Sequence, residues 1–134
     1  PAARRFNFRI VSQLALNYRG GPLAGGGAGR VRGGDRLPWV ERADGRGDNF
    51  APLDAVRWQV HVYGEPRAEL AEWCAAVNLP LHAFAWSESC DRAGFQQGAA
   101  YLVRPDGYVA LAEPAGDPQA IGRFVEERGI GIRP

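Results

Sequence analysis

The strongest restriction on the fold of this 134-residue chain is a predicted β-hairpin at residues 101–111. Its sequence, Tyr-Leu-Val-Arg-Pro-Asp-Gly-Tyr-Val-Ala-Leu, places two short apolar stretches on either side of a turn. Asp106-Gly107 tolerates the positive φ angles that a two-residue hairpin turn needs, and Pro105 presets the chain for turning. We therefore expect two antiparallel strands joined at Asp106-Gly107.

Two further strands are predicted before this hairpin. Residues 58–63 alternate between two faces, with Trp58, Val60 and Val62 on one and Gln59, His61 and Tyr63 on the other. Residues 81–86 are apolar on both faces apart from His82, which is typical of a central strand covered on both sides. A helix between these strands makes the pair a right-handed parallel crossover.

Helices are predicted at residues 66–78 and 117–129. Pro66 suits the first position of the earlier helix, whose buried face is spaced i, i+3, i+4, i+7 at Leu70, Trp73, Cys74 and Val77. Asp117-Pro118 is an N-cap and first-position pair for the later helix, and Gly129 stops it. Its core-facing residues are Ile121, Phe124 and Val125.

The first third of the chain differs in composition from the rest. Residues 6–18 carry apolar side chains at nearly every second position, which favours a strand. In residues 20–34, eight of fifteen are glycine, so we expect a flexible linker or surface loop rather than a core element. We place a domain boundary there, with an arm and linker at 1–33 and a domain at 34–134. Residues 37–42 are a candidate short strand.

These elements follow the order β, β-α-β, β-β, α. The fold class is therefore α/β, a thioredoxin-like sandwich with a mixed sheet of four to five strands flanked by helices and an extended N-terminal arm. A domain of this size has room for one core.

The charge is distributed unevenly. Residues 1–34 hold six arginines and no acid, whereas residues 35–134 hold ten arginines and fifteen acids. All basic residues are arginine, which is typical of a GC-rich, bacterial genome, so we infer no nucleic-acid partner from the arm. No apolar run approaches the roughly 20 residues of a membrane span. Two cysteines without short spacing fit a reducing cytoplasm.

Thiol chemistry in this topology needs a cysteine at the helix N-terminus, where the helix dipole lowers its pKa. Residues 64–67 hold none. We expect Cys74 to be a core residue. Cys90 falls in a polar loop, which leaves its exposure to solvent open, and a disulfide between the two lacks support. Before the hairpin, Gly98-Ala99-Ala100 stands where an active thioredoxin carries a cis-proline.

Other candidate sites are weaker. His61 and His82 should lie on neighbouring strands, and Cys90 could join them as a metal ligand, but zinc sites need three or four well-placed ligands. The loop at residues 87–91 has Ser87 and Ser89 without a histidine at motif spacing. The glycines of residues 25–29 lack the ending of a phosphate loop. We assign no catalytic, cofactor-binding or metal-binding residue.

Three blocks of sequence carry a resemblance to a known family. They are Ser-Gln-Leu-Ala-Leu-Asn-Tyr-Arg-Gly-Gly-Pro-Leu at residues 12–23, Gly-Asp-Arg-Leu-Pro at 34–38 and Tyr-Leu-Val-Arg-Pro-Asp-Gly-Tyr-Val-Ala at 101–110. Together they resemble the C-terminal region of FAD-dependent aromatic-ring hydroxylases, flavoprotein monooxygenases similar to phenol and pentachlorophenol hydroxylases.

This resemblance implies a redox-inactive, structural domain, with FAD and NAD(P)H used by the parent enzyme and no cofactor in this fragment. Its implied partners are the preceding FAD and substrate domains, and a homodimer is left open. Two alternatives stay open as well: a peroxiredoxin- or thioredoxin-related oxidoreductase, and a free-standing dimeric binding module that uses the strand at residues 6–18.

Overall fold

A computed structural model describes residues 24–131 of the chain, and the strand expected at residues 6–18 lies outside them. The described residues form one six-stranded sheet in the order β2-β1-β6-β5-β3-β4. The strands are β1 (Gly25–Ala28), β2 (Val31–Arg32), β3 (Gln59–Tyr63), β4 (Leu81–Phe84), β5 (Ala100–Val103) and β6 (Val109–Glu113). The helices are η1 (Ala51–Ala55), α2 (Ala68–Ala76), α3 (Glu88–Ala93) and α4 (Pro118–Glu127).

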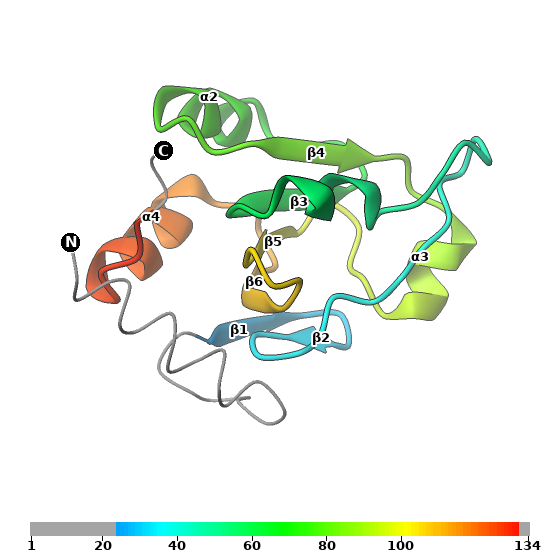
Figure 1. Ribbon diagram of the computed structural model, residues 1–134, viewed down its shortest axis with the longest axis horizontal. Helices are drawn as coiled ribbons and strands as arrows, with labels where there is room; N and C mark the ends of the chain where they lie inside the picture. The colour runs from blue at the N-terminus through cyan, green and yellow to red at the C-terminus, as the bar shows by residue number, and fades with distance from the viewer. Residues whose placement is uncertain (1–23, 132–134) are drawn as a thin grey trace.

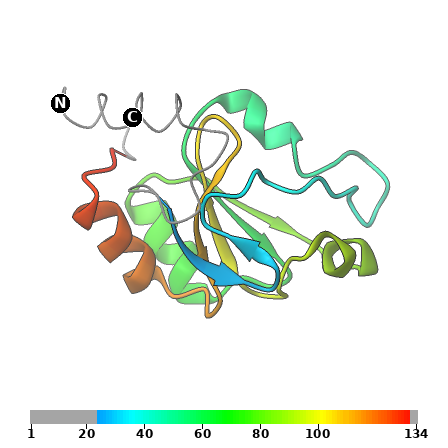
Figure 2. The ribbon, with the colours of Figure 1, turned by 90° about the horizontal axis from the view of Figure 1, so that it is seen from below.

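The predicted thioredoxin-like arrangement is confirmed. β3 and β4 are parallel and joined through α2, whereas β5 pairs antiparallel with both β3 and β6. α4 follows the hairpin and packs near α2 (Figure 1). Viewed from below, α2 and α4 lie on one side of the sheet and α3 on the other (Figure 2).

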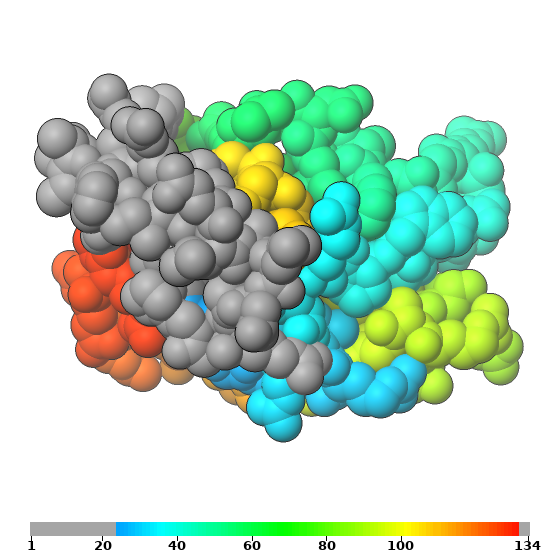
Figure 3. Space-filling view, turned by 60° about the horizontal axis from the view of Figure 1, so that its bottom comes forward, coloured from blue at the N-terminus to red at the C-terminus, as the bar shows by residue number. Residues whose placement is uncertain are grey.

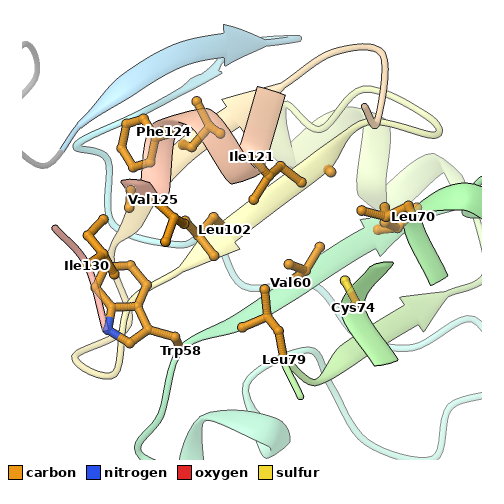
Figure 4. Close-up of a cluster of buried hydrophobic side chains, with 14 of the residues drawn as sticks. Trp58, Val60, Leu70, Cys74, Leu79, Leu102, Ile121, Phe124, Val125 and Ile130 are labelled. Carbon is orange, nitrogen blue, oxygen red and sulfur yellow. The ribbon is translucent and has the colours of Figure 1, made fainter. Parts of the chain in front are cut away.

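Each face of the sheet has its own core. The predicted alternation of β3 is confirmed, because Val60 and Val62 belong to one cluster and Tyr63 to the other. The first cluster lies under α2 and α4 (Figure 4). The predicted limits of α4 also hold, since the side chain of Asp117 accepts a hydrogen bond from the Gln119 amide.

The sheet has six strands where four to five were expected. The glycine-rich segment supplies two of them, β1 and β2, so its interpretation as a linker or surface loop was wrong. β1 pairs parallel with β6, and β2 extends the sheet beyond it. The glycines allow close packing: a Cβ on Gly33 would lie 2.2 Å from the carbonyl oxygen of Gly25, and one on Gly26 2.2 Å from that of Ala112. The division of the chain at residue 33 stays a prediction.

Three local predictions also need correction. β4 is the last strand of the sheet rather than a central one, and Phe84 alone of its four residues is buried. Residues 37–42 form no strand; the isolated bridge of Arg36 to Tyr108 lies just before them, and Glu41 forms another with Asp48. The loop expected after residue 87 contains α3.

The hairpin turn is longer than expected. The amide of Gly107 donates to the carbonyl of Arg104, and Gly107 alone in the turn has a positive φ, of 88°. This four-residue turn uses Pro105 at its second position and ends in a bulge. A Cβ on Gly107 would lie 3.6 Å from the side chain of Leu53 in η1, and the two segments lie side by side in Figure 3 (yellow and green). The fully buried guanidinium of Arg104 pairs with Asp106.

Candidate functional site

The loop between β3 and α2 occupies the position at which thioredoxin-like enzymes carry their reactive thiol. Gly64 adopts a φ of 125° there, and its amide donates to the carbonyl of Phe84. A Cβ at Gly64 would come within 3.2 Å of the amide nitrogen of Gly98. Gly98 in turn donates its amide to the carbonyl of Tyr63. The loop is therefore closed tightly against the segment that precedes β5.

Arg67 is the N-cap residue of α2 and supplies a cation where a redox enzyme has a thiol. Its guanidinium lies 2.7 Å from the carboxylate of Glu69 and donates to the carbonyl of Ala115 at 3.4 Å. A guanidinium donates hydrogen bonds and is not a nucleophile. Within residues 24–131 the peptide bonds are all trans, so Gly98 and Ala99 carry no equivalent of the cis-proline.

The two cysteines lie on opposite faces of the sheet. Cys74 is buried in the cluster under α2, as predicted, and burial raises the pKa of its thiol to about 11. Cys90 belongs to the other cluster and is 1% exposed, so the structure decides the question of its exposure, which the sequence left open. Its sequence context is polar, but α3 turns the thiol inward. Both thiols are free.

A chain of hydrogen bonds runs along the second face of β3, and sequence reasoning missed it. The Nε2 atom of His61 lies 2.7 Å from Oε1 of Gln59, and its Nδ1 lies 3.1 Å from the hydroxyl of Tyr63. Asn49 donates its side-chain amide to that same hydroxyl at 2.9 Å and to the carbonyl of Pro38 at 2.8 Å. The alternation of polar residues in β3 was visible, but Asn49 is distant in sequence.

Burial controls the protonation of this network. It lowers the pKa of His61 to about 3, with a smaller contribution from neighbouring His82. It lowers the pKa of half-buried His82 and raises that of Tyr63 far above its usual range. A neutral imidazole and a neutral phenol match the hydrogen bonds present. The network fixes the loop around Asn49 to the sheet and holds no charge that would activate a substrate.

The predicted neighbourhood of the two histidines is confirmed. His61 pairs directly with His82 across β3 and β4, and their ring centroids lie 5.7 Å apart. The part of the chain that the structure describes nevertheless contains no group of three or more His, Cys, Asp or Glu side chains placed to hold a metal ion. We assign no metal site to the pair.

The serines of residues 87–91 serve the start of α3. Ser87 is its N-cap residue, with its hydroxyl 3.6 Å from the sulfur of Cys90. Ser89 accepts a hydrogen bond from Arg92. Neither contact places a general base beside a serine hydroxyl. The two serines therefore belong to the first turn of α3 and not to a nucleophilic site.

A shallow pocket of about 310 Å³ lies beside the end of β4. It is lined by Arg42, Ala43, Asp44, Phe84 and Ala85. Arg42 and Asp44 pair at 3.4 Å, and the guanidinium of Arg42 lies over the ring of Phe84. Its walls contain an ion pair and apolar groups but no nucleophile.

Among the helices of the described region, none has both the length and the apolar character needed to cross a membrane.

Comparison with known families agrees with this fold. Residues 31–127 match the model of the family described as aromatic-ring hydroxylase, C-terminal. The chain belongs to this family. In the comparison with curated proteins, nothing matched. The matched region of the aromatic-ring hydroxylase C-terminal domain includes β2 to α4 and therefore the whole crossover and hairpin.

A solved structure that resembles the domain comes from structural and functional studies of BexE, on oxidation during BE-7585A biosynthesis. It has a TM-score of 0.53 and 26% sequence identity, and the match covers 93% of this chain. This chain spans only 24% of the BexE chain, so the similarity concerns one domain of a longer protein.

Proposed function

We propose that this chain acts as a redox-inactive, structural C-terminal domain of an FAD- and NAD(P)H-dependent monooxygenase of aromatic compounds. One observation carries the proposal: the helix N-terminus that would hold a reactive thiol is occupied by Gly64 and Arg67 in a chain of the aromatic-ring hydroxylase C-terminal family. Both thiols are buried, on different faces of the sheet. The domain keeps the frame of a thioredoxin without its reactive group.

The flavin of the proposed parent enzyme finds no fitting site in the described residues. Dinucleotide sites place the pyrophosphate at a glycine-rich turn that leads from a strand into a helix. Here the glycine-rich residues lead from β1 into β2, and a Cβ at Gly26, Gly29 or Gly33 would collide with neighbouring backbone. We therefore derive no catalytic step through FAD, which belongs in this proposal to the preceding domains.

The proposed role is to pack against the preceding FAD and substrate domains and to supply contacts between subunits. The basic residues of the arm would meet those domains. The arginine bias and the two free cysteines support a bacterial, cytoplasmic parent enzyme.

A flavin-binding experiment tests the proposal. The purified 134-residue chain is mixed with FAD and passed through a gel-filtration column while visible absorbance is recorded. We expect all flavin absorbance to elute as free FAD. A flavin complex that survives the column would overturn the assignment.

An activity assay separates this proposal from the peroxiredoxin- or thioredoxin-related alternative. We expect neither insulin reduction nor thiol-dependent peroxide consumption above the rate without protein. Activity that disappears on replacing Cys90 with serine would favour the oxidoreductase instead.

A further inference from the structure

The chain contains two Asp-Gly pairs, Asp44-Gly45 and Asp106-Gly107, and no Asn-Gly pair. At Asp-Gly a backbone rearranges readily, because glycine has no Cβ to keep its amide nitrogen away from the preceding carboxyl group. The two pairs lie in similar turns but in different surroundings. A difference in their reactivity would therefore come from the fold and not from the pair itself.

Each aspartate bends its side chain over the peptide that follows it. Oδ1 of Asp44 accepts a hydrogen bond from the amide of Arg46 at 2.9 Å, and Oδ1 of Asp106 accepts one from the amide of Tyr108 at 3.4 Å. In both turns the glycine has a positive φ and donates its amide to the carbonyl three residues before it. A carboxyl oxygen that reaches the amide two residues ahead carries its carbon toward the glycine nitrogen in between.

The first pair has room to rearrange. Residues 41–47 are all exposed, in a loop that projects from the body of the domain (Figure 1, cyan). Among the described residues, none beyond its neighbours in sequence comes within 4 Å of a Cβ built on Gly45. Asp44 pairs with Arg42 at 3.4 Å, but both side chains are nearly half exposed, and such a surface pair holds its partners weakly.

The second pair is held by the core. Oδ2 of Asp106 accepts a hydrogen bond from the guanidinium of Arg104, whose side chain is wholly buried. A Cβ on Gly107 would lie 3.6 Å from the side chain of Leu53, and the carbonyl of Gly107 accepts from the amide of Leu37 at 3.0 Å. Movement of the Asp106 carboxyl group toward the glycine nitrogen would break the ion pair and leave a buried charge, which is costly.

We propose that Asp44-Gly45 is a site of spontaneous modification, at which the native protein forms isoaspartate, and that the fold protects Asp106-Gly107 from the same reaction. This inference goes beyond the proposed function and does not depend on it.

The reaction needs no reactant other than water. The carboxylate of Asp44 takes up a proton, and the amide nitrogen of Gly45 attacks its Cγ atom. A C–N bond forms while the nitrogen loses its proton and the carboxyl group its hydroxyl, so one water leaves and a five-membered succinimide remains. Water then opens the ring at either carbonyl. Opening at the main-chain carbonyl leaves the chain linked through the side chain of residue 44, and opening at the other restores aspartate.

Ageing of the purified 134-residue chain at 37 °C and neutral pH tests the proposal. Protease digestion and mass spectrometry separate isoaspartyl from aspartyl peptides, and an isoaspartate-specific carboxyl methyltransferase with labelled S-adenosylmethionine counts the modified residues. We expect isoaspartate to accumulate at residue 44 at least about ten times faster than at residue 106, because a turn held by a buried ion pair opens more rarely. Equal rates at the two positions, or no isoaspartate at residue 44, would overturn the proposal.

Ageing in concentrated urea separates the effect of the fold from that of the flanking sequence. We expect the two rates to agree within about twofold there, because both pairs then lie in unfolded chain. A tenfold preference for residue 44 that persists in urea would show that neighbouring residues select it, against the protection proposed for Asp106.

Two surface variants test the assignment to this loop. Asp44→Glu keeps the charge beside Arg42 but would have to close a slower six-membered ring, so the isoaspartyl peptide at residue 44 should disappear. The matched control is Asp54→Glu, at an exposed aspartate followed by alanine, which should leave the rate at residue 44 unchanged. A methylation count that Asp44→Glu does not lower would place the reaction elsewhere and exclude this site.

Discussion

The Nε2 atom of His61 lies 2.7 Å from the Oε1 atom of Gln59, and this contact determines the tautomer of a wholly buried imidazole. With its proton on Nε2, the ring uses Nδ1 to accept from the hydroxyl of Tyr63. That hydroxyl accepts in turn from Asn49. Every member of the chain has a partner in this neutral state, and an added proton on Nδ1 would displace the hydrogen of Tyr63.

Acid should therefore destabilise the domain before most carboxylates titrate. The folded pKa of His61, about 3, lies below its unfolded value of 6.5, so the unfolded state binds more protons between these pH values. The contribution of His61 to the free energy of unfolding is fully present above pH 6.5 and is lost on acidification. The free energy of unfolding then falls with a limiting slope of about 1.4 kcal/mol per pH unit. Urea unfolding between pH 5 and 7 measures this slope.

The variant His61→Phe should flatten that slope, while His82→Phe, at a half-exposed position, should reduce it less. A slope that does not change when His61 is replaced would contradict this explanation.

Asn49→Ala should destabilise the domain by about 1–3 kcal/mol. The change removes the side-chain oxygen that accepts from the amide of Val40 and the side-chain amide that donates to the hydroxyl of Tyr63. Both groups are buried, and an unsatisfied buried polar group costs free energy. Chemical denaturation measures the loss. Gln119→Ala is the control, because the side chain of Gln119 is exposed. Its backbone amide, which the substitution keeps, donates to the side chain of Asp117 that caps α4. Equal losses in the two variants would show that the network contributes nothing specific.

Two glycine variants should change stability in opposite directions. Gly33→Ala places a Cβ 2.2 Å from the carbonyl oxygen of Gly25, and we expect a loss of about 1–3 kcal/mol or more. Gly122→Ala in α4 meets only the ring of Trp73, at 3.6 Å, and should gain about 0.5–1 kcal/mol from helix propensity. Thermal unfolding of both variants tests the pair. A neutral Gly33→Ala would mean that β1 and β2 contribute little to the sheet.

Both thiols should be unreactive in the native protein. Burial raises the pKa of Cys74 to about 11, and Cys90 is closed off by α3. We expect no modification by an aromatic disulfide reagent at pH 8 within minutes, and modification of two thiols after denaturation. Rapid native modification of Cys90 would show that α3 opens readily.

Local sequence signals were sufficient where one element's own residues decide its structure. The alternation of β3, the buried face around Cys74 and the cap at Asp117 all follow from spacing or from a capping side chain. The crossover and the hairpin then limited the fold to a thioredoxin-like sandwich, which the sheet confirms.

Predictions failed or were left open where contacts with residues distant in the sequence determine the place or the burial of a residue. An apolar strand looks the same at an edge and in the centre, so β4 was misplaced. Cys90 lies among polar residues, yet α3 turns it inward. Asn49 enters the network with Tyr63 only because the loop after β2 folds back over the sheet.

The order of elements, the domain class and the lack of a thiol at the start of α2 could all be derived from the order of the residues. The role of the glycines of β1 and β2 became clear only from the folded chain. Their composition indicates freedom of the backbone, but Gly26, Gly29 and Gly33 lie where another backbone passes too close for a Cβ. Such contacts join residues far apart in sequence, and no local pattern records them.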